Sequence, residues 1–493
     1  MLPNHLFSIW EISKRIIVLI LLAIGPIGCK KLIEVDPPVN SIIGNEIYNS
    51  DATASSVLTG IYTDMSNAGV FCGSNSISLR AGLSADELVA TTEPSDILNR
   101  IYTNSLTNNG DQLFWTDLYT YVFRVNSAIE GISQSQNITQ STKRQLLGEA
   151  KFLRAFFYFY LINFYGDVPL LLSTDIKVNN VASRTSTDEV YKQVIADLIE
   201  AKESLSTMYL AANLSTESNE RLRPNKFVAS ALLARVYLYV EKWDLAEQEA
   251  NFVIDGTSKY TLESLTNVFL KDSREAIWQL QPVNAGMNTF DAAVFVLAAG
   301  DGRPEGPDGQ AFSRPVYLSN QLCENFELSD RRKLLWIGNA NSNGRVYPYA
   351  FKYKAWIFGV ERTEYLVVFR LAELYLIRSE SRLMQGRLTG DNSAETDLNI
   401  IRRRSGLENL HSSDKLTMLT YILNEKRSEF FTEWGHRWLD LKRTGKIDQV
   451  MILAAPLKGG SWTSYKALYP IPVNDIKRNP SLRGHQNPGY PEI

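Results

Sequence analysis

The chain has 493 residues, of which 44% are hydrophobic and 11% aromatic, with a formal net charge of -3 at pH 7. This composition is typical of a globular protein and excludes a disordered or fibrous chain. Lys and Arg are scattered rather than gathered in one stripe, which argues against a nucleic-acid partner.

The N-terminus has the pattern of an export signal. Lys14 and Arg15 precede an unbroken apolar run over residues 16–24. This run is too short for a membrane span of about 20 residues, but it fits a signal-peptide core of roughly 7–15. Cys29 follows the run directly after the small residue Gly28, an arrangement that is similar to a bacterial lipoprotein signal. An ordinary secretory signal that is cut nearby is the alternative.

The predicted organisation follows from this signal. We expect residues 1–28 to be a lipoprotein signal peptide, Cys29 to be the lipidation site, and residues 29–44 to be an extended tether because Pro37 and Pro38 disfavour helix. Residues 45–493 are then a single domain.

Besides Cys29, the sequence holds only Cys72 and Cys323. Two cysteines in so long a chain are not a disulfide framework, so the fold must depend on packing. The sequence leaves open whether these two residues pair.

A long helix is predicted over residues 143–165, because apolar side chains recur there at intervals of three and four and share one face. They are Ala150, Leu153, Phe157, Leu161 and Phe164. Gly166 ends the helix. The aromatic run Phe156–Tyr160 is interpreted as buried packing rather than as a platform for stacking sugars.

Two helical hairpins are predicted further along. Residues 223–254 have the marker residues of a degenerate tetratricopeptide unit, namely Leu233, Ala234, Tyr237, Trp243 and Ala246. The second hairpin covers residues 365–404, and the apolar stripe of its first helix consists of Val367, Leu371, Leu374 and Tyr375. A stacked array of such hairpins needs about three repeats to bury a continuous core. We therefore expect helices near 111–132, 143–165 and 188–205 to supply the remaining repeats. The predicted fold is therefore mostly α.

Between the hairpins, residues 257–356 lose helical periodicity and form a loop-rich insert containing short strands. Residues 276–280 alternate like a strand, and residues 300–307 are rich in Gly and Pro and must be a loop. Loops on a rigid scaffold commonly carry function. After the second hairpin, a helix is predicted over 420–442, and the prolines near 469–472 predict an extended tail on the surface.

Motifs of catalysis and metal binding are absent from the sequence. Its histidines are isolated, so we expect neither a metal site nor a cofactor. Glu425, Glu429 and Glu433 alternate with arginines at helical spacing, which predicts an ion-pair lattice in preference to a catalytic acid pair. A glycoside hydrolase stays as an alternative, because sequence does not show the separation of carboxyl groups.

At this point five segments of the chain resemble the RagB/SusD family. They are residues 29–38, 152–169, 370–380, 425–443 and 469–490. The last two are the most specific, because Gly-His-Arg-Trp-Leu-Asp-Leu-Lys-Arg followed by Pro-Ile-Pro and Gln-Asn-Pro-Gly-Tyr would rarely arise together by chance. The resemblance covers essentially the whole mature chain.

The resemblance implies a SusD-like fold with four tetratricopeptide-like hairpins, a lipid anchor that holds the protein on the outer membrane facing the cell exterior, and a SusC-like TonB-dependent transporter as partner. Members bind starch, other polysaccharides, host glycans or peptides and do not hydrolyse them. We therefore expect a cell-surface lipoprotein that binds a glycan or other nutrient, is not an enzyme, and delivers its ligand to the transporter. An exported tetratricopeptide-like scaffold that binds proteins is the alternative.

Candidate ligand-binding residues were chosen from loop segments. Aromatic faces cover the apolar faces of sugar rings, and amides or Arg at the edges bind hydroxyls. The candidates are Phe71, Trp336, Tyr347 and Trp356, with Asn339, Asn341 and Arg345 as polar partners. Each of them has a second interpretation as core or as a contact with the transporter. Trp115, Trp278, Trp434 and Trp438 are assigned to packing instead.

Overall fold

The computed structural model describes residues 47–91, 96–108, 113–256, 258–298, 314–342 and 344–492. Residues from Tyr48 onward form one compact unit. The predicted signal peptide, Cys29, the tether and the Gly- and Pro-rich loop at 300–307 lie outside the described residues. In the described ranges, helices that are long and apolar enough to cross a bilayer do not occur.

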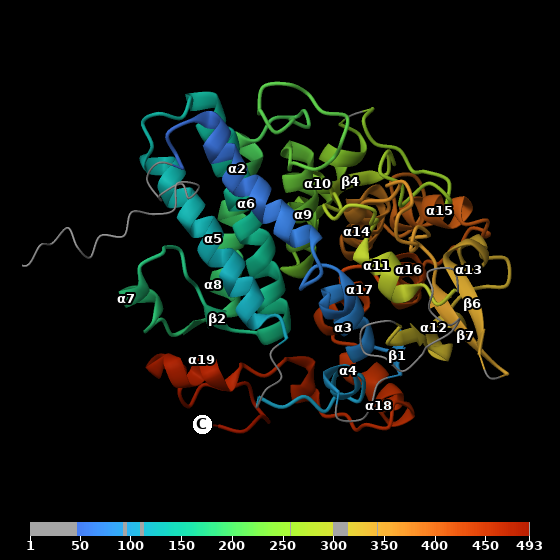
Figure 1. Ribbon diagram of the computed structural model, residues 1–493. Helices are drawn as coiled ribbons and strands as arrows, with labels where there is room; N and C mark the ends of the chain where they lie inside the picture. The colour runs from blue at the N-terminus through green and yellow to red at the C-terminus, as the bar shows by residue number, and fades with distance from the viewer. Residues whose placement is uncertain are drawn as a thin grey trace, which may run out of the picture. The chain divides into compact units, whose positions relative to one another are not determined.

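Helices dominate this unit (Figure 1). The longer ones are α2 (Asp51–Ser66), α3 (Ile77–Ser84), α5 (Trp115–Gln134), α6 (Gln140–Tyr165), α8 (Thr187–Ser204), α9 (Lys226–Tyr239), α10 (Trp243–Ile254), α14 (Leu371–Met384), α15 (Ala394–Arg404), α16 (Lys415–Phe430), α17 (His436–Arg443) and α18 (Ile447–Leu457). The shorter ones are η2 (Gly73–Asn75), α4 (Ile97–Tyr102), α7 (Ile176–Asn179), α11 (Phe290–Phe295), α12 (Asn320–Cys323), α13 (Arg331–Trp336), η3 (Ser464–Ala467), α19 (Val473–Arg478) and η4 (Pro480–Leu482).

The strands of the described residues are short and pair two by two in antiparallel fashion. The pairs are β1 (Leu88–Ala90) with β5 (Val316–Leu318), β2 (Val168–Pro169) with β3 (Arg184–Thr185), β4 (Ala276–Leu280) with β8 (Leu366–Arg370), and β6 (Ile337–Ser342) with β7 (Arg345–Ala350). The predicted strand at residues 276–280 is confirmed as β4, and β5, β6 and β7 also lie in the predicted insert.

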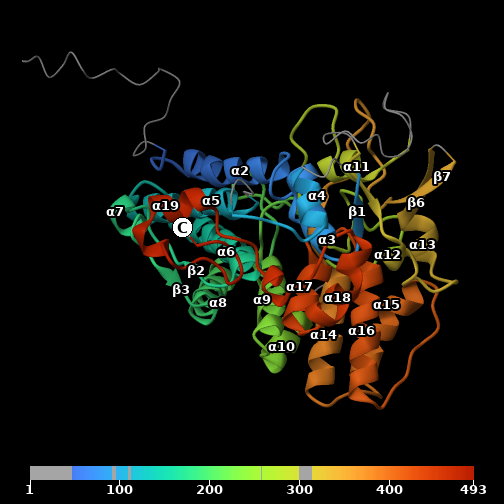
Figure 2. The ribbon, with the colours of Figure 1, turned by 90° about the horizontal axis from the view of Figure 1, so that it is seen from below.

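Successive helices pack as neighbours and form the scaffold. Helix α5 packs on α6, α6 on α8, α8 on α9, α9 on α10, α10 on α14, and α14 on both α15 and α16. Figure 2 shows this run of helices crossing the unit from α5 to α16. The predicted mostly α-helical fold is confirmed, and the helices expected near 111–132 and 188–205 are α5 and α8.

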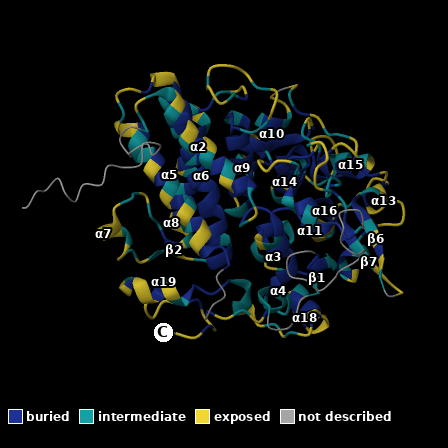
Figure 3. Cartoon of the chain, in the orientation of Figure 1, coloured by how far each residue is buried: buried dark blue, intermediate teal, exposed yellow. Residues whose placement is uncertain are grey.

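Helix α6 lies at the centre of the core. Figure 3 shows it as a largely buried helix next to the partly exposed α2 and α5. The aromatic run Phe156–Tyr160 is fully buried, and the Phe156 ring lies 5.5 Å from the Trp278 ring, centroid to centroid, in a T-shaped contact. This confirms the interpretation of the run as packing. Gly166 then ends the helix with a φ of 72°, a conformation that favours glycine.

The first predicted hairpin is confirmed as α9 and α10. The side-chain oxygen of Asn225 accepts hydrogen bonds from the backbone N–H groups of Phe227 and Val228, both at 3.0 Å, and so begins α9. Ala246 and Ala250 of α10 are fully buried. Their small side chains allow the two helices to approach closely.

The second predicted hairpin is confirmed as α14 and α15, but its first helix begins later than expected. Val367 lies on strand β8, where it pairs with Gln279 of β4, so its assignment to the helical stripe is wrong. The whole segment Leu366–Arg370 is buried. Val367 and Val368 are β-branched and suit a strand that is buried on both faces. Pairing of this strand with β4 therefore outweighs the helical periodicity of the sequence.

The helix predicted over residues 420–442 is interrupted. Between α16 and α17 the chain takes left-handed backbone angles at Thr432, Trp434 and Gly435, with φ of 56°, 49° and 73°. Tertiary hydrogen bonds hold this turn, because Trp434 donates its backbone N–H to Ser78 Oγ at 2.9 Å and its indole N–H to the Val367 carbonyl at 2.7 Å. The expectation that Glu433 shares a helix face with its neighbours is therefore wrong.

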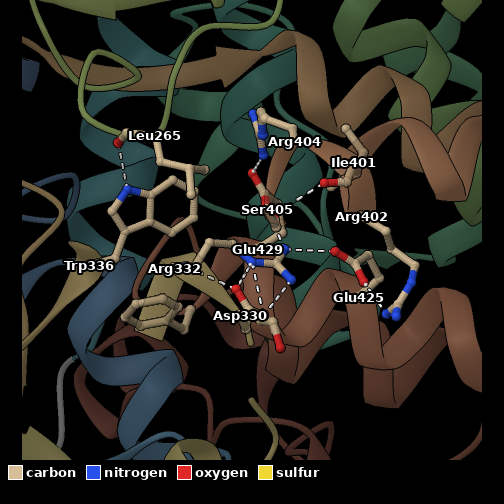
Figure 4. A network of polar contacts seen from close by, with 12 residues as sticks. Leu265, Asp330, Arg332, Trp336, Ile401, Arg402, Arg404, Ser405, Glu425 and Glu429 are labelled. Carbon is tan, nitrogen blue, oxygen red and sulfur yellow. Dashed lines mark hydrogen bonds and ion pairs between the residues drawn. The ribbon is translucent and has the colours of Figure 1, made fainter. Parts of the chain in front are cut away.

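The predicted ion-pair lattice is confirmed, and it joins several elements (Figure 4). Glu429 pairs with Arg332 at 2.8 Å and also with Arg370 and Arg404, while Glu425 lies 2.7 Å from Arg332. Burial alone would raise the pKa of Glu429, but these three guanidinium groups outweigh burial and hold the pKa well below its usual range. The lattice thus connects α13, β8, α15 and α16 through ionised groups.

The C-terminal segment was expected to be an extended surface tail, and this is only partly correct. Tyr469 is 1% exposed, and its hydroxyl lies 2.7 Å from Ser84 Oγ. Asn487 donates its side-chain N–H to the carbonyls of Tyr165 and Tyr469 at 2.9 and 2.8 Å. The segment is therefore partly inside the core, and Val473–Arg478 forms helix α19.

Candidate functional site

A pocket of about 340 Å³ opens where the strand pair β1–β5 meets β7, α4 and α18. Strand β1 packs on α4, and β5 packs on β7. The pocket is lined by Asp86, Leu88, Val89, Tyr102, Tyr317, Ser319, Asn320, Gln321, Arg345, Ala454, Leu457 and Lys458. We call it the tyrosine pocket.

The aromatic side of the pocket is held by three side chains from two strands. Tyr317 of β5 contacts Tyr347 of β7 in a T-shaped arrangement with 5.2 Å between ring centroids. The Arg345 guanidinium lies 5.6 Å from the Tyr317 ring centroid and donates a hydrogen bond to the Tyr317 hydroxyl at 3.0 Å. These contacts fix the orientation of the Tyr317 ring, which is partly exposed.

Opposite the strands, Lys458 is anchored by the end of helix α3. Its ammonium group donates to the carbonyls of Leu83, Ser84 and Ala85 at 2.8–3.0 Å and lies 5.3 Å from the ring centroid of Tyr102. Carbonyls at a helix C-terminus favour a cation. Burial lowers the pKa of Lys458 to about 7, and Asp86 acts in the opposite direction.

Asp86 is the carboxylate of the pocket lining, and it is held by two arginines from other elements. Arg437 Nε lies 2.8 Å from Oδ1, and Arg427 Nη2 lies 2.7 Å from Oδ2. Burial raises the pKa of Asp86, but the arginines outweigh burial and lower it to about 2. Asp86 is therefore ionised at neutral pH.

The arrangement offers the chemistry that a sugar needs. Tyr102 and Tyr317 are partly exposed rings, and the side-chain amides of Asn320 and Gln321 bind no partner among the described residues. Aromatic faces cover the apolar face of a pyranose, and amides bind its hydroxyls in both donor and acceptor roles. The pocket is suited to a hydroxylated ligand of the size of one or two sugar rings.

Two of the predicted ligand-binding residues are buried in the core, so their selection is corrected. Phe71 is 1% exposed and stacks on Phe157 with 5.7 Å between centroids. Trp336 is 0% exposed and donates its indole N–H to the Leu265 carbonyl at 2.8 Å. Neither ring presents a face to a ligand, because hydrophobic packing from distant segments covers both.

The other predicted residues lie on or near the β6–β7 hairpin, but they do not converge. Asn339 pairs with Pro348 and Asn341 with Val346, while Tyr347 pairs with Ala340. Since facing residues share one side of a hairpin and sides alternate along each strand, the two asparagines lie on the side opposite Tyr347 and Arg345. Only Arg345 lines the tyrosine pocket, and Tyr347 supports it through Tyr317.

Trp356 is partly buried and packs on Phe351 with 5.8 Å between ring centroids. Its indole N–H has no hydrogen-bond partner within the part of the chain that the structure describes. The residue belongs to a small apolar cluster behind the hairpin and not to the pocket lining.

The sequence reasoning missed Tyr102 and Tyr317. Tyr317 is an aromatic residue of the predicted loop-rich insert, so the criterion that selected Trp336 and Trp356 also applies to it, whereas Tyr102 lies outside that insert on helix α4. The tyrosines are partly exposed in the pocket, whereas Trp336 is buried and Trp356 packs on Phe351 outside the pocket. This difference depends on tertiary packing, which local spacing in the sequence does not show.

Cys72 and Cys323 are both free in the structure, Cys72 buried and Cys323 partly so. Across the described ranges, groups of three or more His, Cys, Asp or Glu side chains that are placed to hold a metal ion do not occur.

The fold and the pocket define a class of protein: an array of tetratricopeptide-like helical hairpins with a pocket that short strands and loops shape beside it. Residues 45–238 match a family described as starch-binding and associating with the outer membrane, and residues 339–490 match the SusD family. The two matches together cover most of the chain, and the chain belongs to the RagB/SusD family.

Similar proteins agree with this assignment. Two SusD-like proteins of Formosa agariphila are 22% and 24% identical, across 95% and 97% of this chain and 97% and 100% of their own lengths. The starch-binding protein SusD of Bacteroides thetaiotaomicron is 36% identical over 129 residues, which are 25% of this chain and 21% of that protein.

Solved structures show the same fold. A laminarin-binding SusD-like protein aligns with a TM-score of 0.72 at 22% identity, over 90% of this chain and 100% of its own. A SusD superfamily protein of Parabacteroides distasonis aligns with a TM-score of 0.74 at 20% identity, over 89% and 99%.

Proposed function

We propose that this protein captures a glycan in the tyrosine pocket at the cell surface and delivers it to a SusC-like TonB-dependent transporter of the outer membrane. The observation that carries the proposal is the pocket itself, whose lining brings together two partly exposed tyrosine rings, two side-chain amides without a partner among the described residues, an arginine and a lysine. The family description names starch binding at the outer membrane, and relatives are named for starch and laminarin.

The proposal includes the absence of catalysis. Glycoside hydrolysis generally needs two carboxyl groups roughly 5–9.5 Å apart, one of them with a raised pKa that lets it act as an acid. The lining of the tyrosine pocket contains a single carboxyl, Asp86, and its pKa is lowered to about 2. We therefore expect no new reducing ends when the protein is incubated with polysaccharides, and their release would contradict the binding role.

The aromatic rings provide the direct test. We expect Tyr317→Ala and Tyr102→Ala each to weaken binding of the cognate glycan about tenfold, because loss of one stacking face costs on the order of 1 kcal/mol. Calorimetric titration with starch and laminarin oligosaccharides measures the effect. Phe358→Ala is the matched control, since this ring is 72% exposed and lies outside the pocket lining.

Three results of this titration separate the hypotheses. Weaker binding by both tyrosine variants with an unchanged Phe358 variant supports the proposal. Equal binding by all variants would show that the glycan site lies outside the tyrosine pocket. Failure to bind any glycan, together with binding of unstructured peptides, favours the tetratricopeptide-like scaffold.

A further inference from the structure

A second pocket lies between α16, α17 and α18 and has a cationic lining. It has a volume of about 130 Å³, far more than the about 10–15 Å³ that one water needs. Its lining residues are Thr420, Leu423, Asn424, Lys426, Arg427, Arg437, Asp440, Leu441, Thr444, Lys446 and Val450. We call it the arginine pocket.

The positive charges around this pocket exceed the negative ones. Arg427 and Arg437 share a single carboxylate, that of Asp86. Lys426 lies 2.8 Å from Glu380 and 3.8 Å from Asp440, and Arg443 pairs with the same two carboxylates. The four cations of these pairs thus share three carboxylates, Asp86, Glu380 and Asp440.

Two donors of the lining are unused. The Nε–H of Arg427 is buried and has no hydrogen-bond partner in the described part of the chain. The ammonium group of Lys446, which is partly exposed, forms no ion pair or side-chain hydrogen bond with any described residue. A buried unpaired donor is costly, and an acceptor that enters the pocket would remove this cost.

Glu87 is a further carboxyl that interacts with Arg427 and Arg437, and it does not fully balance the excess. It lies beside Asp86 in the chain and is 2% exposed. Burial, and then the charge of Asp86, raise its pKa to about 7. It therefore supplies only part of a negative charge at neutral pH.

The shape of the pocket admits a ligand from solvent. Thr420 and Asn424 at its edge are exposed, whereas Leu423 and Lys426 are buried and form its inner side. We propose that the arginine pocket binds a small anionic group, a carboxylate or a sulfate, between Arg427, Arg437 and Lys446. Charge-assisted hydrogen bonds from guanidinium and ammonium groups are the interactions that such oxygens form most strongly.

The test uses the purified protein and small probes, namely glucuronate, inorganic sulfate and uncharged glucose, titrated calorimetrically at constant ionic strength. We expect glucuronate and sulfate to bind through Lys446 and the neighbouring arginines, whereas any binding of uncharged glucose should not change when Lys446 is replaced. Lys446→Gln should weaken binding of both anions at least about fivefold, because one charge-assisted contact is lost. Lys415→Gln is the matched control, since Lys415 is exposed on the same α16 and lies outside the lining.

A second variant closes the pocket without touching its ion pairs. Asn424→Trp places a large ring at the exposed edge and should abolish binding of both anions. The proposal is overturned if neither anion binds, if Lys446→Gln weakens binding of glucose as much as binding of the anions, or if Lys446→Gln and Lys415→Gln behave alike. Sulfate has no sugar ring, so its response to the Lys446 variant does not depend on the function proposed for the tyrosine pocket.

Discussion

At the residue scale, Asp86 and Glu87 are neighbours in the chain with opposite shifts of pKa. Asp86 is held ionised by Arg427 and Arg437. Burial, and then the neighbouring charge of Asp86, raise the pKa of Glu87 from 4.5 to about 7, and its Oε1 has no hydrogen-bond partner among the described residues. Two consecutive residues therefore differ in charge state: Asp86 is ionised beside two arginines, whereas Glu87 favours its neutral form.

This contrast predicts a pH dependence of stability. Because the folded-state pKa of Glu87 is raised, its stabilising effect is complete below about pH 4.5 and is lost as pH rises through about 7. We expect the free energy of unfolding of Glu87→Gln, relative to wild type, to rise by about 2.5 kcal/mol from pH 5 to pH 8. Urea titrations at both pH values measure this gain, and an equal difference at both would show that Glu87 is ionised in the folded protein.

Arg370 is the residue on which the buried lattice depends. Its guanidinium lies 2.8 Å from Glu433 and 3.1 Å from Glu275 and also pairs with Glu429. We expect Arg370→Met to lower the free energy of unfolding by about 3–5 kcal/mol, because it leaves buried carboxylates without their partner.

The control for Arg370→Met is Arg403→Met. Arg403 is exposed, and among the described residues its side chain bonds only to that of Asn409, so its loss should change stability by less than about 0.5 kcal/mol. Equal destabilisation by the two variants in urea titrations would contradict the structural role of the lattice.

At the element scale, the break between α16 and α17 is the main departure from the predicted helices. Gly435 begins α17 with a φ of 73°, and a Cβ there would lie 2.9 Å from Ala81 Cβ and 3.3 Å from Ile77 Cγ2 of α3. The glycine therefore allows both the backbone angle and the contact between α17 and α3.

Comparison of two glycines separates these effects. We expect Gly435→Ala to cost more unfolding free energy than Gly445→Ala, by on the order of 1–3 kcal/mol. Gly445 has a similar φ of 65° but nothing within 4 Å of its Cβ position, so its variant carries the backbone strain alone. Equal denaturation midpoints for the two variants would show that the contact with α3 adds nothing.

At the scale of the whole molecule, we propose that a lipid on Cys29 holds the protein, and with it the tyrosine pocket, at the membrane. We expect Cys29→Ala to move the protein from the membrane fraction to the soluble fraction and to abolish incorporation of labelled fatty acid, since acyl chains supply stable anchoring. Cys323→Ala, which changes a free cysteine of the folded unit, should leave both properties unchanged. Retention of the Cys29 variant in the membrane would argue for another anchor.

The sequence by itself determined the helical scaffold and the family. The periodic apolar faces of α6 and the marker residues of α9 and α10 predict their own helices, because a 3.6-residue repeat is a local property of the chain. The burial of Phe156–Tyr160 followed from the same repeat.

Only the tertiary structure decided which aromatic residues reach a ligand and where the last helices break. Trp336 and Tyr317 satisfy the same sequence criterion, yet packing from distant segments buries the first and leaves the second at a pocket. Val367 lies in a strand because it pairs with β4, and Trp434 adopts left-handed backbone angles in a turn that a hydrogen bond to α3 holds. Local propensity does not encode either contact. Pairing between distant segments, unlike a helical repeat, depends on contacts that no single stretch of sequence contains.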